Sequence, residues 1–260
     1  MRRSRILFFF LIIPVLLLAV FVVYRNGRAP GIQSVFPAFS GDEKAAVEAV
    51  FPSGEVVRFG VYSNIFKVGE GSLAYAGTVL RGGERQQHVR MQVETLSVND
   101  TDEVYGREDF SFPRRVERNI KLFGRAERIE EIYADDGRSV TISKAVKDRP
   151  LETQVLGSEE PLQNVLLMIY RLRNDPALDV GKAYAINLPT QKFVLSVKSR
   201  TKLKVPLGVF SVFYIESTPA KYKIWMTADP KRLPVRIQGL VSFGMVYLAA
   251  TSVESAEKQP

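Results

Sequence analysis

The sequence of 260 residues contains no cysteine and only one histidine, His88. Without cysteine the chain can form no disulfide bond, thiolate nucleophile, iron–sulfur cluster or cysteine-ligated zinc site. With one histidine it cannot build a metal site from several histidines, and a Ser–His–Asp mechanism would have to use His88. That residue falls on the polar side of an alternating segment, beside Arg90 and Glu94, as a solvated surface histidine would. We therefore expect no metal and no cofactor.

The positive net charge is concentrated at the N-terminus. The formal charge is +8, but residues 1–28 contain five arginines and no acidic residue, so the remaining chain carries 31 basic and 28 acidic residues. Such a mixed surface differs from the basic footprint of a nucleic-acid-binding protein. We expect no nucleic-acid partner.

The longest apolar run extends from Ile6 to Tyr24, and its 19 positions contain no charged residue. As a helix it would span about 28 Å, close to the thickness of a bilayer core. Three arginines precede the run and two follow it, which slightly favours a cytoplasmic N-terminus. We interpret the run as a single-pass anchor in the inner membrane, with the rest of the chain in the periplasm. The alternative is a cleaved signal peptide, although its best cleavage site, Gly27-Arg28-Ala29, is followed directly by a proline.

Composition divides the chain into four parts. Residues 1–28 are the anchor with its basic flanks, and residues 29–52, rich in glycine and proline, form a juxtamembrane linker. Residues 53–253 form one β-rich extracytoplasmic domain, large enough to be stable through its core alone. Residues 254–260 form a disordered tail.

Apolar and polar residues alternate along most of the domain. Val57, Phe59 and Val61 recur on one parity, as do Val89 and Met91, which predicts antiparallel strands with one wet face. Further strands are predicted over residues 115–122, 127–133, 139–146, 183–188, 193–199, 209–216, 222–227, 235–241 and 245–251.

One segment has helical spacing instead. Ser158, followed by two acidic residues and Pro161, predicts a helix start. The residues from Leu162 to Tyr170 are apolar on nearly all sides, so this helix should be buried. The elements together predict a mainly β fold: a curved antiparallel sheet or partly open β-barrel wrapped around one buried helix, preceded by a single transmembrane helix.

Several short blocks of the domain occur in an order that is shared with a known family. The blocks are Pro52-Ser53-Gly54-Glu55, Val68-Gly69-Glu70-Gly71, Tyr170-Arg171-Leu172-Arg173, Gly181-Lys182, Pro206-Leu207-Gly208-Val209-Phe210, Ile224-Trp225-Met226-Thr227-Ala228-Asp229 and Arg232-Leu233-Pro234-Val235-Arg236-Ile237. Over about residues 50–253 the chain resembles the bacterial domain of unknown function 3108. The resemblance implies an exported, β-rich envelope domain and no established activity. Members of that family often carry cleavable export signals, whereas this chain keeps an anchor.

Aromatic residues are abundant, with 16 Phe and 10 Tyr. Many fall on predicted strands, where they either pack a core around the helix or line an incompletely filled concave face. The second interpretation predicts that this inner face binds an acyl chain or a lipidated partner. Its candidate residues are Phe59, Tyr75, Phe193, Phe210, Phe213 and Trp225.

Catalytic groupings are weak in this sequence, so we expect no catalytic residue. Adjacent carboxylates such as Glu130 and Glu131 point to opposite faces of a strand and cannot converge. The segment from Gly69 to Ala74 fits a dinucleotide-binding pattern, but a strand follows it where that motif needs a helix. We expect a non-catalytic envelope protein that binds a hydrophobic ligand. The alternatives are a scaffold that acts through its outer surface and a hydrolase that uses two distant carboxylates.

Overall fold

The computed structural model describes residues 51–239 and 246–255. These belong to one compact unit, residues 45–260. The predicted anchor from Ile6 to Tyr24 and most of the predicted linker and tail lie outside the described residues. In the described part of the chain, helices are too short or too polar to cross a bilayer.

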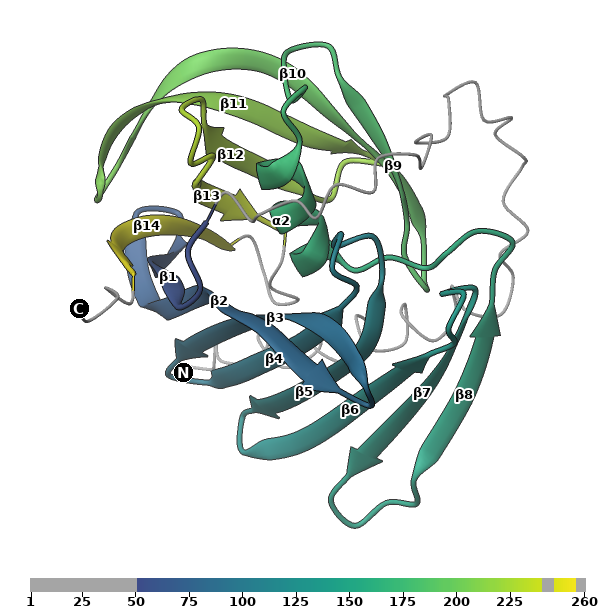
Figure 1. The fold of residues 1–260 in the computed structure, drawn as a ribbon. Coiled ribbons are helices and arrows are strands. Elements are labelled where there is room, and N and C mark those ends of the chain that lie inside the picture. The colour runs from purple at the N-terminus through teal and green to yellow at the C-terminus, as the bar shows by residue number, and fades with distance from the viewer. Residues whose placement is uncertain (1–50, 240–245, 256–260) are drawn as a thin grey trace, which may run out of the picture. The chain divides into compact units, whose positions relative to one another are not determined.

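The described residues form one antiparallel sheet of 14 strands with a single short helix (Figure 1). The helix is α2 (Val165–Asn174). The strands are β1 (Glu55–Ser63), β2 (Phe66–Arg81), β3 (Glu84–Thr95), β4 (Val98–Gly106), β5 (Pro113–Leu122), β6 (Arg125–Tyr133), β7 (Ser139–Val146), β8 (Glu152–Gly157), β9 (Ala183–Asn187), β10 (Lys192–Val205), β11 (Gly208–Thr218), β12 (Lys223–Thr227), β13 (Pro234–Gln238) and β14 (Val246–Glu254).

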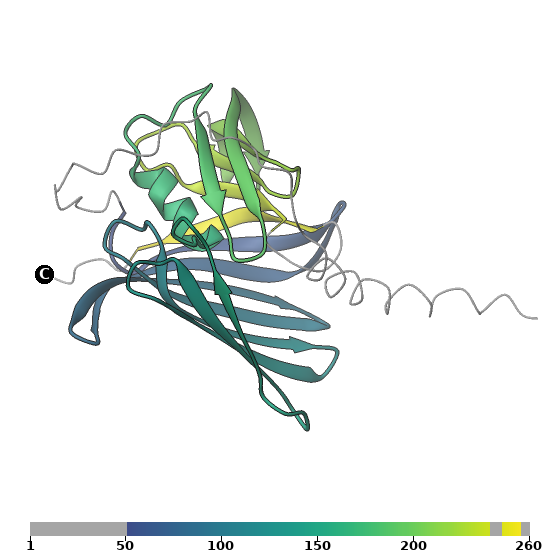
Figure 2. The same cartoon turned by 90° about the vertical axis from the view of Figure 1, so that its right-hand side faces the viewer.

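Almost every strand pairs with its neighbours in the sequence. The exception is the pairing of β1 with β14, which joins a first half, β1 to β8, to a second half, β9 to β14. The sheet stays open, with β8 and β9 at its two ends. It curls so that the two halves lie on either side of α2 (Figures 1 and 2). The predicted curved antiparallel sheet around one buried helix is confirmed.

The alternating pattern accounts for the buried face of the sheet. Val57, Phe59 and Val61 of β1 are buried, and the register sets Val57 opposite Leu73 of β2, which faces Met91 of β3. Directly opposed residues share a face, so these apolar side chains form continuous rows across the strands. We call this the inner face because it carries the core around α2.

The helix begins later than the sequence predicts. Its N-cap is Asn164, whose Oδ1 accepts hydrogen bonds from the N–H groups of Leu166 and Leu167, at 2.8 and 3.4 Å. The predicted start at Ser158 is wrong, because the backbone before Asn164 bonds to the sheet instead: the Gln163 N–H donates to the Asn187 carbonyl on β9 at 2.7 Å. Seven of the ten helical residues are buried, which confirms the predicted burial.

Arg173, in the last turn of α2, ties the helix to the sheet. Its guanidinium forms a bidentate ion pair with the Glu55 carboxylate on β1, with N–O distances of 2.5 and 3.1 Å. Both side chains are buried, and Arg173 also donates to the Lys231 carbonyl. The register of α2 inside the sheet is therefore set by a charge pair as well as by apolar packing.

Candidate binding site on the inner face of the sheet

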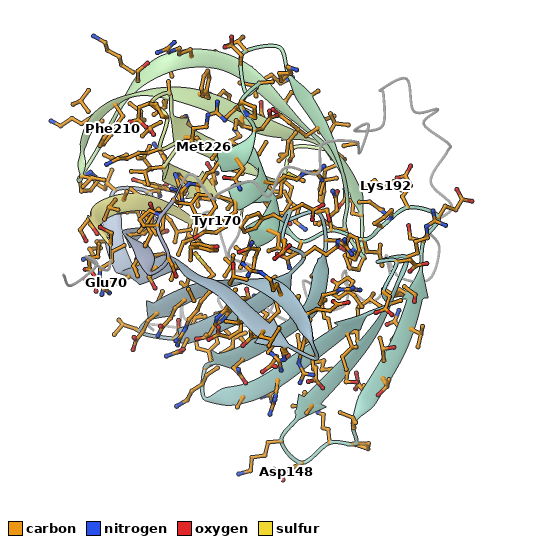
Figure 3. The ribbon with its side chains drawn as sticks, viewed as in Figure 1. Glu70, Asp148, Tyr170, Lys192, Phe210 and Met226 are labelled. Carbon is orange, nitrogen blue, oxygen red and sulfur yellow. The ribbon has the colours of Figure 1, made fainter. Side chains whose placement is uncertain are left out.

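The six predicted aromatic residues are not brought together in one place. Phe59, Tyr75, Phe193 and Phe213 are buried in the core, at 5% exposed or less. Phe210 and Trp225 are half-buried, and Figure 3 shows Phe210 near the rim of the sheet.

Tyr75 belongs to a cluster of rings around α2. Its ring lies 4.8 Å from Phe51 and 5.7 Å from Tyr170, and Phe110 packs on the same group. Tyr170 lies between the two halves of the sheet (Figure 3). Edge-to-face and tilted ring contacts of this kind are typical of a filled core. At this end of the inner face, ligand space is taken up by side chains.

Trp225 alternates with the buried residues Ile224 and Met226, so its side chain leaves β12 on the other side. Its ring lies 5.1 Å from that of Tyr214 and 5.0 Å from the Arg236 guanidinium. Arg236 in turn lies 4.0 Å from the ring of Tyr247. Trp225 therefore belongs to a ladder of aromatic and cationic side chains across β11 to β14.

The apolar rows of the inner face become charged as they cross to β4, β5 and β6. Met91 is opposite Asp102, which is opposite Arg118, which is opposite Ile129. In the next row, Val93 is opposite Asp100. Carboxylates and a guanidinium thus replace the core residues of β1 to β3 within the same face.

Arg118 is the centre of this charged cluster. Its Nε and Nη2 donate to the two oxygens of Asp100 at 3.0 and 2.5 Å, and its Nε lies 3.2 Å from Asp102 Oδ1. Glu131 accepts a hydrogen bond from the Tyr133 hydroxyl at 2.5 Å. We call Asp100, Asp102, Arg118, Glu131 and Tyr133 the Arg118 cluster. It holds three carboxyl groups for one guanidinium, so it leaves negative charge in excess.

Burial shifts the proton equilibria of this cluster. Burial raises the pKa of Asp102 from 3.8 to about 7; Arg118 opposes the shift, and Asp100 and Glu131 add to it. Burial also raises the pKa of Glu131, against the hydrogen bond from Tyr133 and the charge of Arg118. The Asp102 side chain is 24% exposed, so a carboxyl group that can exchange a proton near neutral pH faces the inside of the sheet and remains reachable.

Beyond the Arg118 cluster the inner face is only partly covered. Ile120, Ile129, Ile142 and Leu156 share this face and are half-buried. Val104, Val116 and Val140 lie on the same face and are buried. The core thus thins out toward β6, β7 and β8 and leaves apolar surface exposed beside charged groups. We call these four residues the half-open apolar face.

The second half of the sheet contributes aromatic side chains opposite the cluster. The ring of Phe193 lies 5.1 Å from that of Tyr222, in the β11–β12 connection. Burial raises the pKa of Tyr222, and the positive charge of Arg118 opposes this shift. Phe193 is the predicted site residue that packs on Tyr222.

His88 lies on the outer face, as predicted. Its Nε2 is 2.5 Å from Glu103 Oε2, and its ring stacks on Tyr105 at 4.5 Å. In the described residues, no group of three or more acidic or histidine side chains has the arrangement of a metal site. A polar hollow of about 270 Å³ also opens on this face, beside Arg58, Glu70 and Gln92.

The Arg118 cluster is not visible in the sequence. Asp100 and Asp102 lie in β4, a strand that the alternation did not predict because two of its inward positions are acidic. Glu130 and Glu131 do point to opposite faces: Glu130 pairs with Arg115, while Glu131 joins the cluster. The sequence does contain a signal for the cluster, since β4, β5 and β6 each carry a charged residue at an inward position. That signal can be recognised only when the register of the strands is known.

Comparisons with known proteins give distant structural likenesses. A β-barrel-like protein of the DUF1849 group from Brucella abortus has a TM-score of 0.46 and 8% identity, covering 78% of this chain and 98% of that one. A Bacteroides fragilis protein, provisionally described as exported and with a YmcC-like fold, has a TM-score of 0.26 and 8% identity, covering 79% and 98%. A Parabacteroides distasonis protein, provisionally described as a lipoprotein, has a TM-score of 0.25 and 10% identity, with the same coverage.

The comparison with protein families is more direct. A search of the curated proteins gave no match. The model of a family described as "Protein of unknown function (DUF3108)" matches residues 58–250, nearly the whole described sheet. This is the family that the sequence blocks resemble. The chain therefore belongs to the DUF3108 family of proteins of unknown function.

Proposed function

We propose that this protein is a non-catalytic component of the cell envelope that binds a hydrophobic ligand, a lipid or a lipidated partner. The uncharged run from Ile6 to Tyr24 supports a location at the inner membrane with the β domain in the periplasm. If the run is instead a cleaved signal peptide, the domain is also exported from the cytoplasm. The domain thus works where lipids and lipidated proteins are its neighbours.

The observation that carries the proposal is the half-open apolar face. A fully packed sheet would bury its inward isoleucines, yet Ile120, Ile129 and Ile142 are only half-buried beside a buried core. Covering such surface with an acyl chain is favourable by about 25 cal/mol for each Å² removed from water. The ligand would lie along β5 to β7, between the Arg118 cluster and Phe193.

The other predicted aromatic residues support the site from a distance. Phe59, Tyr75 and Phe213 are packed against other side chains, so they give the inner face its rigidity and hold α2 in place. The acyl chain would extend this core where the protein's own side chains end. The Arg118 cluster would then meet the polar end of the ligand, because its excess of carboxyl groups favours a hydrogen-bond donor or a cation.

A second candidate function is hydrolysis by two carboxyl groups. Burial raises the pKa of Asp102 to about 7 and also raises that of Glu131, which interacts with Asp102, and a pair of carboxyl groups can serve as acid and base in hydrolysis. This proposal predicts hydrolysis of a glycosidic substrate that Asp102→Asn abolishes. Binding alone predicts no turnover of such substrates by either form.

Two isoleucines of β6 provide a matched test of the binding proposal. Ile129 faces inward and Ile132 faces outward on the same strand, where it is 48% exposed. The full chain and its variants Ile129→Gln and Ile132→Gln would be purified from an envelope fraction, and native mass spectrometry with lipid extraction would identify bound molecules. We expect a lipid of defined mass with the wild type and Ile132→Gln, and about tenfold less with Ile129→Gln, as loss of a buried isoleucine contact implies.

The same experiment can refute the proposal. A clean apo mass for the wild-type chain would leave the half-open apolar face without a ligand. Equal lipid in all three proteins would place the lipid elsewhere, for example around the apolar N-terminal run.

A further inference from the structure

Four hairpin connections at one end of the first half of the sheet expose large apolar side chains. Together with the adjoining strand ends, these connections comprise residues 63–67, 95–98, 121–126 and 147–151, which we call the tip row. Ile65 is 82% exposed, Phe123 is 74% exposed, Leu151 is 65% exposed, and Leu96 is fully exposed. Each connection therefore exposes an apolar side chain that is not part of the core.

The four connections are neighbours in space. The Phe123 N–H donates a hydrogen bond to the Ser97 carbonyl at 2.8 Å, which joins the second and third connections. Paired strands lie about 4.8 Å apart, so successive hairpins are about 10 Å apart and the row is about 30 Å long. The ends of these strands fall along one side of the sheet (Figure 2).

The tip row is also basic. Its 20 residues include five basic side chains and one acidic side chain. They are Lys67, Lys121, Arg125, Lys147, Arg149 and Asp148. Lys67 pairs with Glu70 at 2.8 Å, and the other four basic side chains are exposed. All four segments of the row thus expose an apolar side chain, and three of the four also carry basic side chains.

The opposite end of the same hairpins has the reverse character. Its connections, residues 81–84, 107–112 and 134–138, contain three basic and five acidic residues. Their phenylalanines, Phe110 and Phe112, are buried, although Leu80 is exposed beside them. Since both ends belong to the same strands, this difference in charge and burial is not a by-product of hairpin geometry.

We propose that the tip row docks on the surface of an anionic lipid bilayer. The apolar side chains would enter the head-group region, and the lysines and arginines between them would bind lipid phosphates. A protein interface would instead need a contiguous apolar centre depleted in charge, whereas the apolar groups of successive connections lie about 10 Å apart, with cations beside them in three of the four.

The chain outside the structure permits this orientation. Strand β1 starts at the end opposite to the tip row and runs toward it, because its last residue, Ser63, begins the first segment of the row. The 24 residues predicted as a linker can extend to roughly 80 Å, well beyond the roughly 30 Å length of β1. A domain anchored by Ile6 to Tyr24 can therefore turn its tip row toward the same membrane.

The absence of cysteine makes the test direct. Single cysteines would replace Phe123 or Leu96 in the tip row and Arg138 at the opposite end, and each would carry a nitroxide label. The full chain would be reconstituted in vesicles of phosphatidylcholine alone or with phosphatidylglycerol. Electron paramagnetic resonance would measure accessibility to oxygen and to a neutral nickel complex. Both leaflets have the same composition, so either orientation of the chain is informative.

We expect nickel accessibility at positions 123 and 96 to fall about fivefold in the anionic vesicles, the effect of about one well-placed cation, and to stay constant at position 138. The triple variant Lys121→Glu/Arg125→Glu/Arg149→Glu should restore accessibility at position 96, while Arg138→Glu should not. A tip label as accessible as the label at position 138 would overturn the proposal. So would protection that is equal in neutral vesicles, or that appears without vesicles as protein concentration rises, which would indicate a second copy of the chain. Lipid extraction at the inner face is a separate readout, so the two proposals can fail independently.

Discussion

Replacing Glu55 by alanine tests whether an ion pair holds α2 inside the sheet. The Arg173 side chain is completely buried and that of Glu55 is 6% exposed. Besides Glu55, the guanidinium contacts the Lys231 carbonyl through two donors at 3.2 Å and lies 4.4 Å from the ring of Phe51. These contacts fix the guanidinium in place, so it cannot move to water when its carboxylate partner is removed.

The expected cost follows from that burial. Removing one partner of a buried ion pair leaves an uncompensated charge and typically costs about 3–5 kcal/mol. For a domain of this size each kcal/mol lowers the unfolding midpoint by about 2–4 °C, so Glu55→Ala should lower it by roughly 10 °C. Glu55→Gln should cost less, because its amide oxygen still accepts one of the two hydrogen bonds. Thermal unfolding of residues 45–260, followed by circular dichroism, measures these shifts.

An exposed pair on the same strand serves as the control. Arg58 and Glu254 have nearly the same geometry, with N–O distances of 2.5 and 2.9 Å, but their side chains are 54% and 52% exposed. Glu254→Ala should leave the midpoint unchanged, since water solvates the remaining arginine. If Glu55→Ala behaves like Glu254→Ala, the buried pair does not hold the helix and the argument from burial is wrong.

Two further substitutions test the interior. Because burial raises the pKa of Asp102 from 3.8 to about 7, the folded protein holds a proton between these pH values that the unfolded chain has released, so stability should fall as the pH rises from 4 to 7. Glu131 acts in the same direction. Asp102→Asn should raise the free energy of unfolding at pH 8, by at most about 4 kcal/mol, and leave it unchanged at pH 4. An equal effect at both pH values would contradict the pKa shift. A β-carbon on Gly106 would lie 2.5 Å from Leu167 of α2, so Gly106→Ala should cost about 1–3 kcal/mol, and Leu167→Ala in the same chain should relieve the clash. Gly157→Ala, with open space around it, is the matched control, and an equal loss there would show that the clash is not the cause.

The sequence predicts the strands whose inward positions are uniformly apolar. Val57, Phe59 and Val61 identify β1, and Val89 and Met91 identify β3, because burial requires a period of two there. Strand β4 is not predicted by this pattern, because two of its inward residues are carboxylates. They are compensated by Arg118 on β5, which the sequence alone does not identify as their partner. The edge strand β8 is not predicted either, because most of its residues are exposed and pair on one side only.

The candidate site, too, can be predicted only in part from the sequence. The aromatic residues of the inner face could be predicted from parity, and Phe59, Tyr75, Phe193 and Phe213 are indeed buried there. Which of them reach open space could not be predicted, because that depends on how far α2 fills the sheet. The half-open apolar face appears only once the register shows that Ile120, Ile129, Ile142 and Leu156 lie on the same side of the sheet and are not fully buried.

The pairing of the first strand with the last has a consequence for how the chain folds. Thirteen strand pairings hold the sheet, and all but one join neighbours along the chain, which close small loops and form quickly. The pairing of Val56 with Glu254 joins the two ends of the domain. It is the one strand pairing that has a large cost in loop-closure entropy. The two halves can therefore assemble as separate hairpin arrays before β1 pairs with β14. Since the ends already lie side by side, a circularly permuted chain that is opened between β8 and α2 should fold to the same sheet, with the slow closure replaced by a covalent link.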